Sequence, residues 1–121
     1  MQLLAFAETK NWLEIYSAKE LTAYFDNGTY TVEKENSQSV INCWIKFSYA
    51  EGDSYVHCYI RTTDMQFRVQ EFNEYANGKL IRSIDRSSEG WKTPAPNSNM
   101  AKLLTNIVSF VQTNTSAQNN K

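Results

Sequence analysis

Apolar and polar residues alternate with a period of two through most of the chain, the pattern of β-strands with one buried face. Clusters of Gly, Asn, Asp and Ser separate the alternating segments and mark turns. Because most turns are short, we expect the strands to pair antiparallel as a meander. We count about six strands among seven alternating segments, of which residues 30–34 alternate least clearly: residues 12–16, 21–26, 30–34, 39–49, 55–62, 65–73 and 80–84.

The turns set the expected register of the central strands. A hairpin centred on Gly52-Asp53 puts Phe47 opposite Cys58 and Cys43 opposite Thr62. The two thiols then share a face but lie roughly 13 Å apart along the strands. A disulfide needs Cα atoms within about 7 Å, so we expect no Cys43–Cys58 bridge and two buried free thiols. A turn at residues 63–64 and the Asn77-Gly78 hairpin continue the meander.

The residues after position 97 follow the helical period. Met100, Leu103, Leu104, Ile107, Val108 and Val111 form one apolar stripe. Asn97 or Ser98 can cap the helix, and the polar segment 113–121 is expected to be a disordered tail. The predicted fold class is α+β, with this helix packed on the apolar face of the sheet within a single domain, residues 8–112. That face carries Ile41, Ile45, Phe47, Val56, Cys58, Ile60, Phe67 and Val69.

Docking of the helix leaves the opposite face of the sheet open. The expected register pairs Trp44 with Arg61, Lys46 with Tyr59, and Tyr59 with Arg68. Interleaved rings and cations are typical of protein-contact surfaces. The alternative interpretation is an ordinary wet face, on which Lys and Arg stems cover the rings. The predicted protein-contact residues are Trp44, Lys46, Tyr55, His57, Tyr59, Arg61, Arg68 and Phe72.

The first seven residues resemble the end of a secretory leader. Ala5-Phe6-Ala7 has the small-x-small form of a cleavage site, and Leu3 and Leu4 would be the remainder of its apolar region. The alternatives are a short first strand or a remnant of cloning. A leader predicts an extracytoplasmic location: periplasm, outer surface or secreted.

Composition narrows the class of partner. The net charge is −1 and the pI about 5.8, which argues against nucleic-acid binding. No stretch approaches the roughly 18 apolar residues of a transmembrane segment. We expect no metal site and no cofactor, because the carboxylates are scattered and the chain has four glycines in all.

Catalysis is not expected. The single histidine, His57, cannot pair with Cys58, because neighbouring strand residues point to opposite faces. The expected register places His57 beside Ser48 and Gln70, where a Ser48–His57 pair is geometrically allowed but lacks an orienting carboxylate.

Several segments, in order, match a known family: NWLEIYSAKELTAYFD, VINCWIKF, VHCYIRTTDMQFRVQEFNEYANGKLIRS and GWKTPAPNSNMAKLL. Over residues 11–112 the chain resembles the bacterial surface-adhesin E (protein E-like) family. The resemblance implies a small exported envelope domain, with an antiparallel sheet and a packed C-terminal helix. It also implies adhesin-like binding of a host matrix or serum protein, and dimer formation.

The chain departs from that family at one position. Family members often tie the strand of Cys58 to a cysteine near the end of the last helix, and residues 106–111 contain none. Cys58 is then unpaired, or it pairs with Cys43 in another register. Two alternatives to adhesin-like binding stay open: a structural homodimeric periplasmic domain without catalytic activity, and an accessory subunit or inhibitor of an enzyme.

Overall fold

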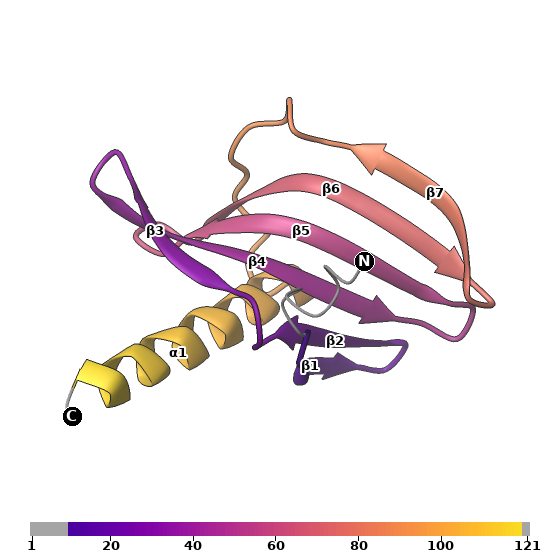
Figure 1. The fold of residues 1–121 in the computed structure, drawn as a ribbon, viewed down its shortest axis with the longest axis horizontal. Helices are drawn as coiled ribbons and strands as arrows, with labels where there is room; N and C mark the ends of the chain where they lie inside the picture. Colours follow the sequence, from indigo (N-terminus) through magenta and orange to yellow (C-terminus); the bar gives the residue numbers. More distant parts are fainter. Residues whose placement is uncertain (1–9, 120–121) are drawn as a thin grey trace, which may run out of the picture.

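The computed structural model describes residues 10–119 as one antiparallel sheet with one helix (Figure 1). This architecture confirms the predicted α+β class. The expected leader remnant, residues 1–7, lies outside the described residues. The elements are β1 (Trp12–Ala18), β2 (Leu21–Asp26), β3 (Thr31–Glu35), β4 (Gln38–Ser48), β5 (Asp53–Arg61), β6 (Gln66–Ala76), β7 (Lys79–Asp85) and α1 (Asn99–Asn119).

The sheet is a meander with one interruption. The strand order is β1-β2-β4-β5-β6-β7, and β3 pairs with β4 beside β2. The turn at residues 27–29 separates β2 from β3, so that β2 pairs with the second half of β4 and β3 with the first half. Backbone φ is positive in three hairpin turns: at Asn36-Ser37, at Met65 between β5 and β6, and at Asn77-Gly78 between β6 and β7, where the residue types predict it.

The predicted register of β4 against β5 is wrong by four residues. Cys43 faces Cys58 rather than Thr62, and Trp44 faces His57 rather than Arg61. The cause is the turn, which closes earlier than predicted: the Tyr49 amide donates to the Gly52 carbonyl at 2.8 Å. Because the shift is even, every side chain keeps its predicted face.

The two thiols therefore lie much closer together than predicted, with 3.9 Å between their sulfurs. Both are buried and free in the structure. The distance argument that excluded a bridge was wrong, although the residues themselves are the buried thiols that we expected.

A β-bulge between β5 and β6 overturns one predicted site residue. The pairs Cys58–Val69 and His57–Glu71 flank one extra residue, Gln70. An extra residue reverses the alternation beyond it. Phe72 therefore pairs with Val56 rather than with Tyr55, and it lies on the helix side of the sheet, not on the open face.

The core lies between α1 and one face of the sheet, as predicted. Five residues of the helical stripe are buried, and Met100 packs at the edge of the core. From the sheet, Ile41, Ile45 and Ile60 are at most 1 % exposed. Hydrophobic burial is the main stabilising term here, and it fixes which face of the sheet stays open.

The N-terminus of α1 agrees with the prediction, and its C-terminus lies further along the chain than predicted. Ser98 is the N-cap: its hydroxyl accepts a hydrogen bond from the Ala101 amide at 3.1 Å. The helix continues to Asn119, so the predicted disordered tail is wrong for residues 113–119. Asn114 contributes to this extension, because its amide donates to the Tyr30 hydroxyl at 3.2 Å.

Candidate functional site

The open face of the sheet carries two groups of contacting aromatic rings and cations, which together we call the ring-and-cation face. It contains all the predicted contact residues except Phe72. Residues of β1, β2, β4, β5 and β6 form it, together with Lys10 before β1 and the loop after β7. Its members are Lys10, Trp12, Tyr24, Trp44, Lys46, Tyr55, His57, Tyr59, Arg61, Arg68, Tyr75 and Trp91.

Lys46 is the centre of the first part of this face. Its Nζ lies 5.4 Å from the ring centroid of Tyr24, 5.9 Å from that of Tyr55 and 6.0 Å from that of Trp12. Tyr55, opposite Lys46 in the sheet, also contacts Trp12 with 5.7 Å between centroids. One ammonium group thus holds three rings by cation–π attraction.

Trp44 and His57 form the second part. They are directly opposite on β4 and β5, and their rings stack with 4.9 Å between centroids and 15° between planes. Tyr59 continues the row beyond His57 at 5.4 Å, and Lys10 Nζ lies 5.3 Å from the Trp44 ring.

Trp91 completes the third part, and the sequence reasoning missed it. Its ring lies 4.5 Å from the guanidinium of Arg61 and 4.8 Å from that of Arg68. Arg68 also lies over Tyr59 at 4.7 Å. The loop reaches this position because Lys92 pairs with Phe67 on β6. A single large aromatic residue in an otherwise polar, proline-containing loop was the available signal.

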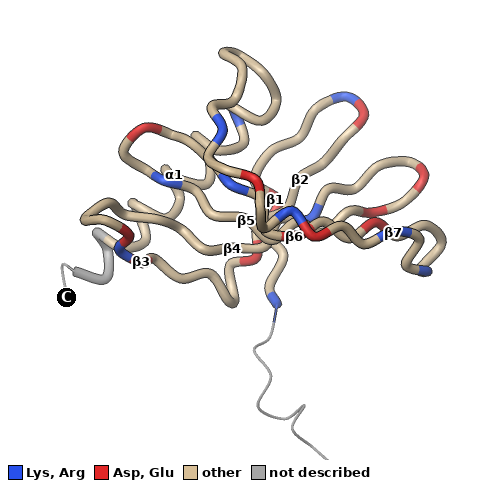
Figure 2. The backbone as a smooth tube through the Cα atoms, turned by 90° about the horizontal axis from the view of Figure 1, so that it is seen from above, with Lys and Arg blue, Asp and Glu red and all other residues tan. Residues whose placement is uncertain are grey.

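Both arginines of this face also form ion pairs with carboxylates at its edge. Arg61 makes two hydrogen bonds of 3.0 Å to Asp64, and Arg68 lies 3.6 Å from Glu35. Arg68 Nε is buried without a hydrogen-bond partner among the described residues. Figure 2 shows acidic and basic residues interspersed along the chain.

His57 is held by two neighbours on the sheet. Its Nε2 lies 2.6 Å from Asn42 Oδ1, and its partner on β6 is Glu71. The expected neighbours, Ser48 and Gln70, are not beside it: Ser48 donates to Asp53 at 2.7 Å. The Ser48–His57 pair that the predicted register allowed does not form.

We expect His57 to titrate below its ordinary pKa. Burial lowers the pKa of His57, although the nearby Glu71 carboxylate opposes this shift. The neutral ring is therefore favoured in the folded state. The free energy of unfolding should be highest above about pH 6.5 and should decrease as the pH falls through the folded pKa, because the unfolded chain protonates His57 more readily. An NMR titration of the imidazole should give a midpoint below 6.5 in the native state and close to 6.5 in urea.

Glu71→Gln is the matched variant for this titration. Removal of the carboxylate should lower the His57 midpoint further, because Glu71 favours the imidazolium. A native midpoint at or above the value in urea would contradict the assigned effect of burial.

The two cysteines lie on the helix side of the sheet. The hydrogen bond to Cys58 and burial both raise the pKa of the Cys43 thiol. Since the thiolate is the reactive form, Cys43 is a weak nucleophile at neutral pH. The contact with Cys58 and burial both favour the neutral thiol of Cys43.

Other site classes receive no support within residues 10–119. No group of three or more His, Cys, Asp or Glu residues there is arranged to hold a metal ion. No helix in this part of the chain has the length and apolar character needed to cross a membrane. No family model, curated protein or solved structure matches the chain.

Proposed function

We propose that the protein is an exported bacterial envelope or surface protein that binds another protein through its ring-and-cation face, without catalysis. The observation that carries this proposal is that two groups of contacting rings and cations lie on one face of the sheet, one around Lys46 and one that runs from Trp44 to Trp91. These three residue types dominate the binding energy of protein interfaces. The adhesin-like resemblance and the Ala5-Phe6-Ala7 segment support an extracytoplasmic partner, such as a host matrix or serum protein.

The geometry also favours binding because the rings are already ordered. Trp44 contacts both His57 and Lys10, and Trp91 contacts the guanidiniums of Arg61 and Arg68. A side chain that is immobilised before binding loses little conformational entropy when a partner arrives. An ordinary wet face with mobile Lys and Arg stems would not have this property.

Surface plasmon resonance against a panel of purified serum and extracellular-matrix proteins tests the proposal. We expect the wild type to bind at least one of them. The double variant Trp44→Ala with Arg61→Ala should lose that binding by about 100-fold or more, since each is a candidate hot spot worth roughly 2 kcal/mol. The melting temperature should fall only by several degrees, because both side chains are partly exposed.

Leu13→Ala with Lys102→Ala is the matched control. It also removes one apolar and one cationic side chain, but both are exposed and lie outside the face. Its binding should equal that of the wild type. Two outcomes count against the proposal: no binding to any panel member, or a ligand that the Trp44/Arg61 variant binds unchanged. A dimer that buries this face, seen by light scattering, would favour the structural homodimer instead.

A further inference from the structure

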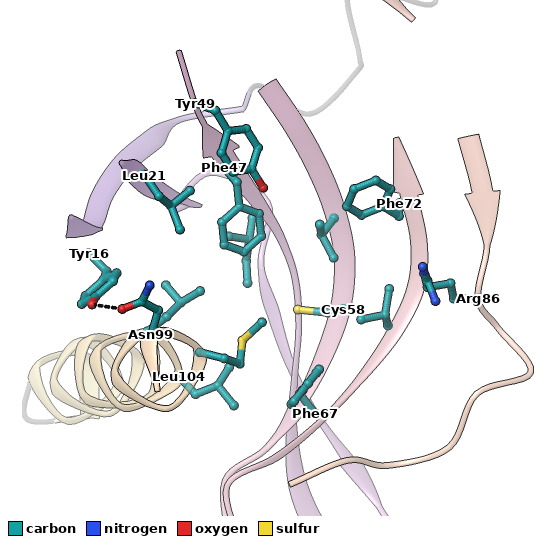
Figure 3. A pocket seen from close by; sticks show the side chains of 15 residues that line it. Tyr16, Leu21, Phe47, Tyr49, Cys58, Phe67, Phe72, Arg86, Asn99 and Leu104 are labelled. Atoms are coloured by element: carbon teal, nitrogen blue, oxygen red, sulfur yellow. Dashed lines mark hydrogen bonds between the residues drawn. The ribbon is translucent and has the colours of Figure 1, made fainter. Parts of the chain in front are cut away.

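An apolar cavity of about 360 Å³ lies on the other side of the sheet, between β4–β6 and the first turns of α1 (Figure 3). It is separate from the ring-and-cation face. Ile45, Val56 and Cys58 of the sheet form its floor, and Met100, Leu103 and Leu104 form its helix wall. Phe47, Phe67, Val69 and Phe72 are further apolar residues of the lining.

The cavity exists because α1 covers only part of the sheet. The hydrogen bonds from helix side chains to the sheet side reach Ile15, Tyr16 and Tyr30, all on the β1–β3 side. Figure 1 shows β6 and β7 extending away from the helix. The bulge at Gln70 adds to the apolar lining, because it turns Phe72 towards the helix side. Phe67, Val69 and Phe72 are therefore only half-buried.

The lining has few polar groups, and they differ in whether their hydrogen bonds are already satisfied. The Tyr16 hydroxyl donates to Asn99 Oδ1 at 2.6 Å, so these two groups satisfy each other. Arg86, directly after β7, is the cation of the lining. Its Nη1 lies 2.6 Å from Glu89 Oε2, and Lys92 Nζ lies 3.0 Å from the other oxygen of the same carboxylate.

The three charged groups of this cluster carry a net charge of +1, and Arg86 is the one that lines the cavity. One carboxylate, Glu89, is shared by the two cations Arg86 and Lys92. A guanidinium has five N–H donors in a fixed fork that suits a carboxylate, and Glu89 accepts from one nitrogen of Arg86. Arg86 can therefore bind a second carboxylate without giving up its first partner.

We propose that this cavity binds a free medium-chain fatty acid, with its carboxylate on Arg86 and its alkyl chain between the sheet and α1. An apolar lining with one cation at its edge matches a molecule that has one charged end and an apolar chain. A cavity of about 360 Å³ lies at the small end of the range of ligand pockets, which favours a medium chain over a long one. Dodecanoate is therefore the probe.

Isothermal titration calorimetry with dodecanoate tests the affinity, and we expect saturable 1:1 binding in the micromolar range. Arg86→Gln should weaken it about 10-fold and leave the binding of dodecanol unchanged. Methyl dodecanoate should bind the wild type about 10-fold more weakly than dodecanoate. This last comparison needs no variant, so it holds even where Arg86→Gln fails to fold. Arg82→Gln is the matched control, because Arg82 pairs with Glu74 outside the cavity.

A fatty acid with a doxyl spin label on its chain tests the location. It should broaden the methyl NMR signals of Val56, Val69 and Leu103 much more strongly than the Trp44 indole signal. Four results would overturn the proposal: no saturable binding below about 1 mM, equal affinity for dodecanoate and its methyl ester, broadening confined to the Trp44 side, or a dimer in which a second copy fills the cavity. None of these bears on protein binding by the opposite face, so the two proposals fail separately.

Discussion

Asp26→Ala should lower the free energy of unfolding by about 3–5 kcal/mol, because a buried carboxylate here satisfies several donors at once. Asp26 is 0 % exposed. Its Oδ1 accepts from the amides of Asn11 at 2.8 Å and Gly28 at 2.9 Å, and its Oδ2 from the Thr29 hydroxyl. Lys10 Nζ lies 3.8 Å away. Alanine would leave these donors without their acceptor.

Chemical denaturation in urea measures this loss, and the melting temperature should fall by roughly 10–20 °C. Asp26→Asn should fall between the wild type and Asp26→Ala, because the amide keeps one acceptor oxygen but its nitrogen cannot accept a hydrogen bond. Glu20→Ala, an exposed carboxylate in the β1–β2 turn, is the control and should stay within about 0.5 kcal/mol. Equal stability of the Asp26→Ala and Glu20→Ala variants would show that the carboxylate does not hold this turn.

Asp26 also explains why the sheet has two strands beside β4. Its side chain ties the start of β1 to the turn at residues 27–29, so that β2 ends there and β3 begins in a new direction. In the sequence, the Asp-Asn-Gly segment indicates a turn. It does not indicate that the start of β1 contacts this turn. A contact between residues 11 and 26 depends on the pairing of β1 with β2, which local propensity does not contain.

The faces of the sheet and helix were predictable because each depends on periodicity alone. Period two separates Ile45 from Trp44, and period 3.6 puts Leu104 and Ile107 on one stripe. A register error of four residues leaves both patterns unchanged. This is why the predicted residues of β4 and β5 lie on the open face, although Trp44 was paired with the wrong residue, Arg61 instead of His57.

The errors arose where one residue decides a geometry. The β4–β5 turn closes at Tyr49 and Gly52, and a Cβ on Gly52 would collide with the Tyr75 carbonyl on β6. Because this constraint comes from β6, the sequence of the β4–β5 hairpin alone could not predict where its turn closes. The bulge at Gln70 likewise has no signature in residues 66–76, and it alone moved Phe72 to the opposite face.

Trp91 shows a third limit of sequence reasoning. The prolines and polar residues of its segment predict a loop, and it is one. Its contribution to the ring-and-cation face comes from the pairing of Lys92 with Phe67, a long-range contact between a loop and a strand. The prediction therefore found most of the site on β4 and β5, but missed Trp12, Tyr24 and Tyr75 on other strands as well as Trp91 in the loop.

Ile107→Ala should lower the free energy of unfolding by about 2–5 kcal/mol, the range for removing a large aliphatic side chain from a core. Ile107 is 0 % exposed and belongs to the main hydrophobic cluster. The helix contains no cysteine that could tie it to the strand of Cys58. Its attachment therefore depends on packing, with support from a few hydrogen bonds such as Asn106 Nδ2 to the Ile15 carbonyl at 2.8 Å.

Urea denaturation of Ile107→Ala, with and without a thiol reductant, separates packing from covalent attachment. We expect the same loss of unfolding free energy in both conditions. The only two thiols of the chain, Cys43 and Cys58, lie on adjacent strands, so no disulfide can link the sheet to the helix. Ser109→Ala, on the exposed side of α1, should change stability by less than about 0.5 kcal/mol. A loss below about 1 kcal/mol for Ile107→Ala would mean that the helix does not cover this core. The assignment of the opposite face of the sheet as the exposed one would then be unsupported.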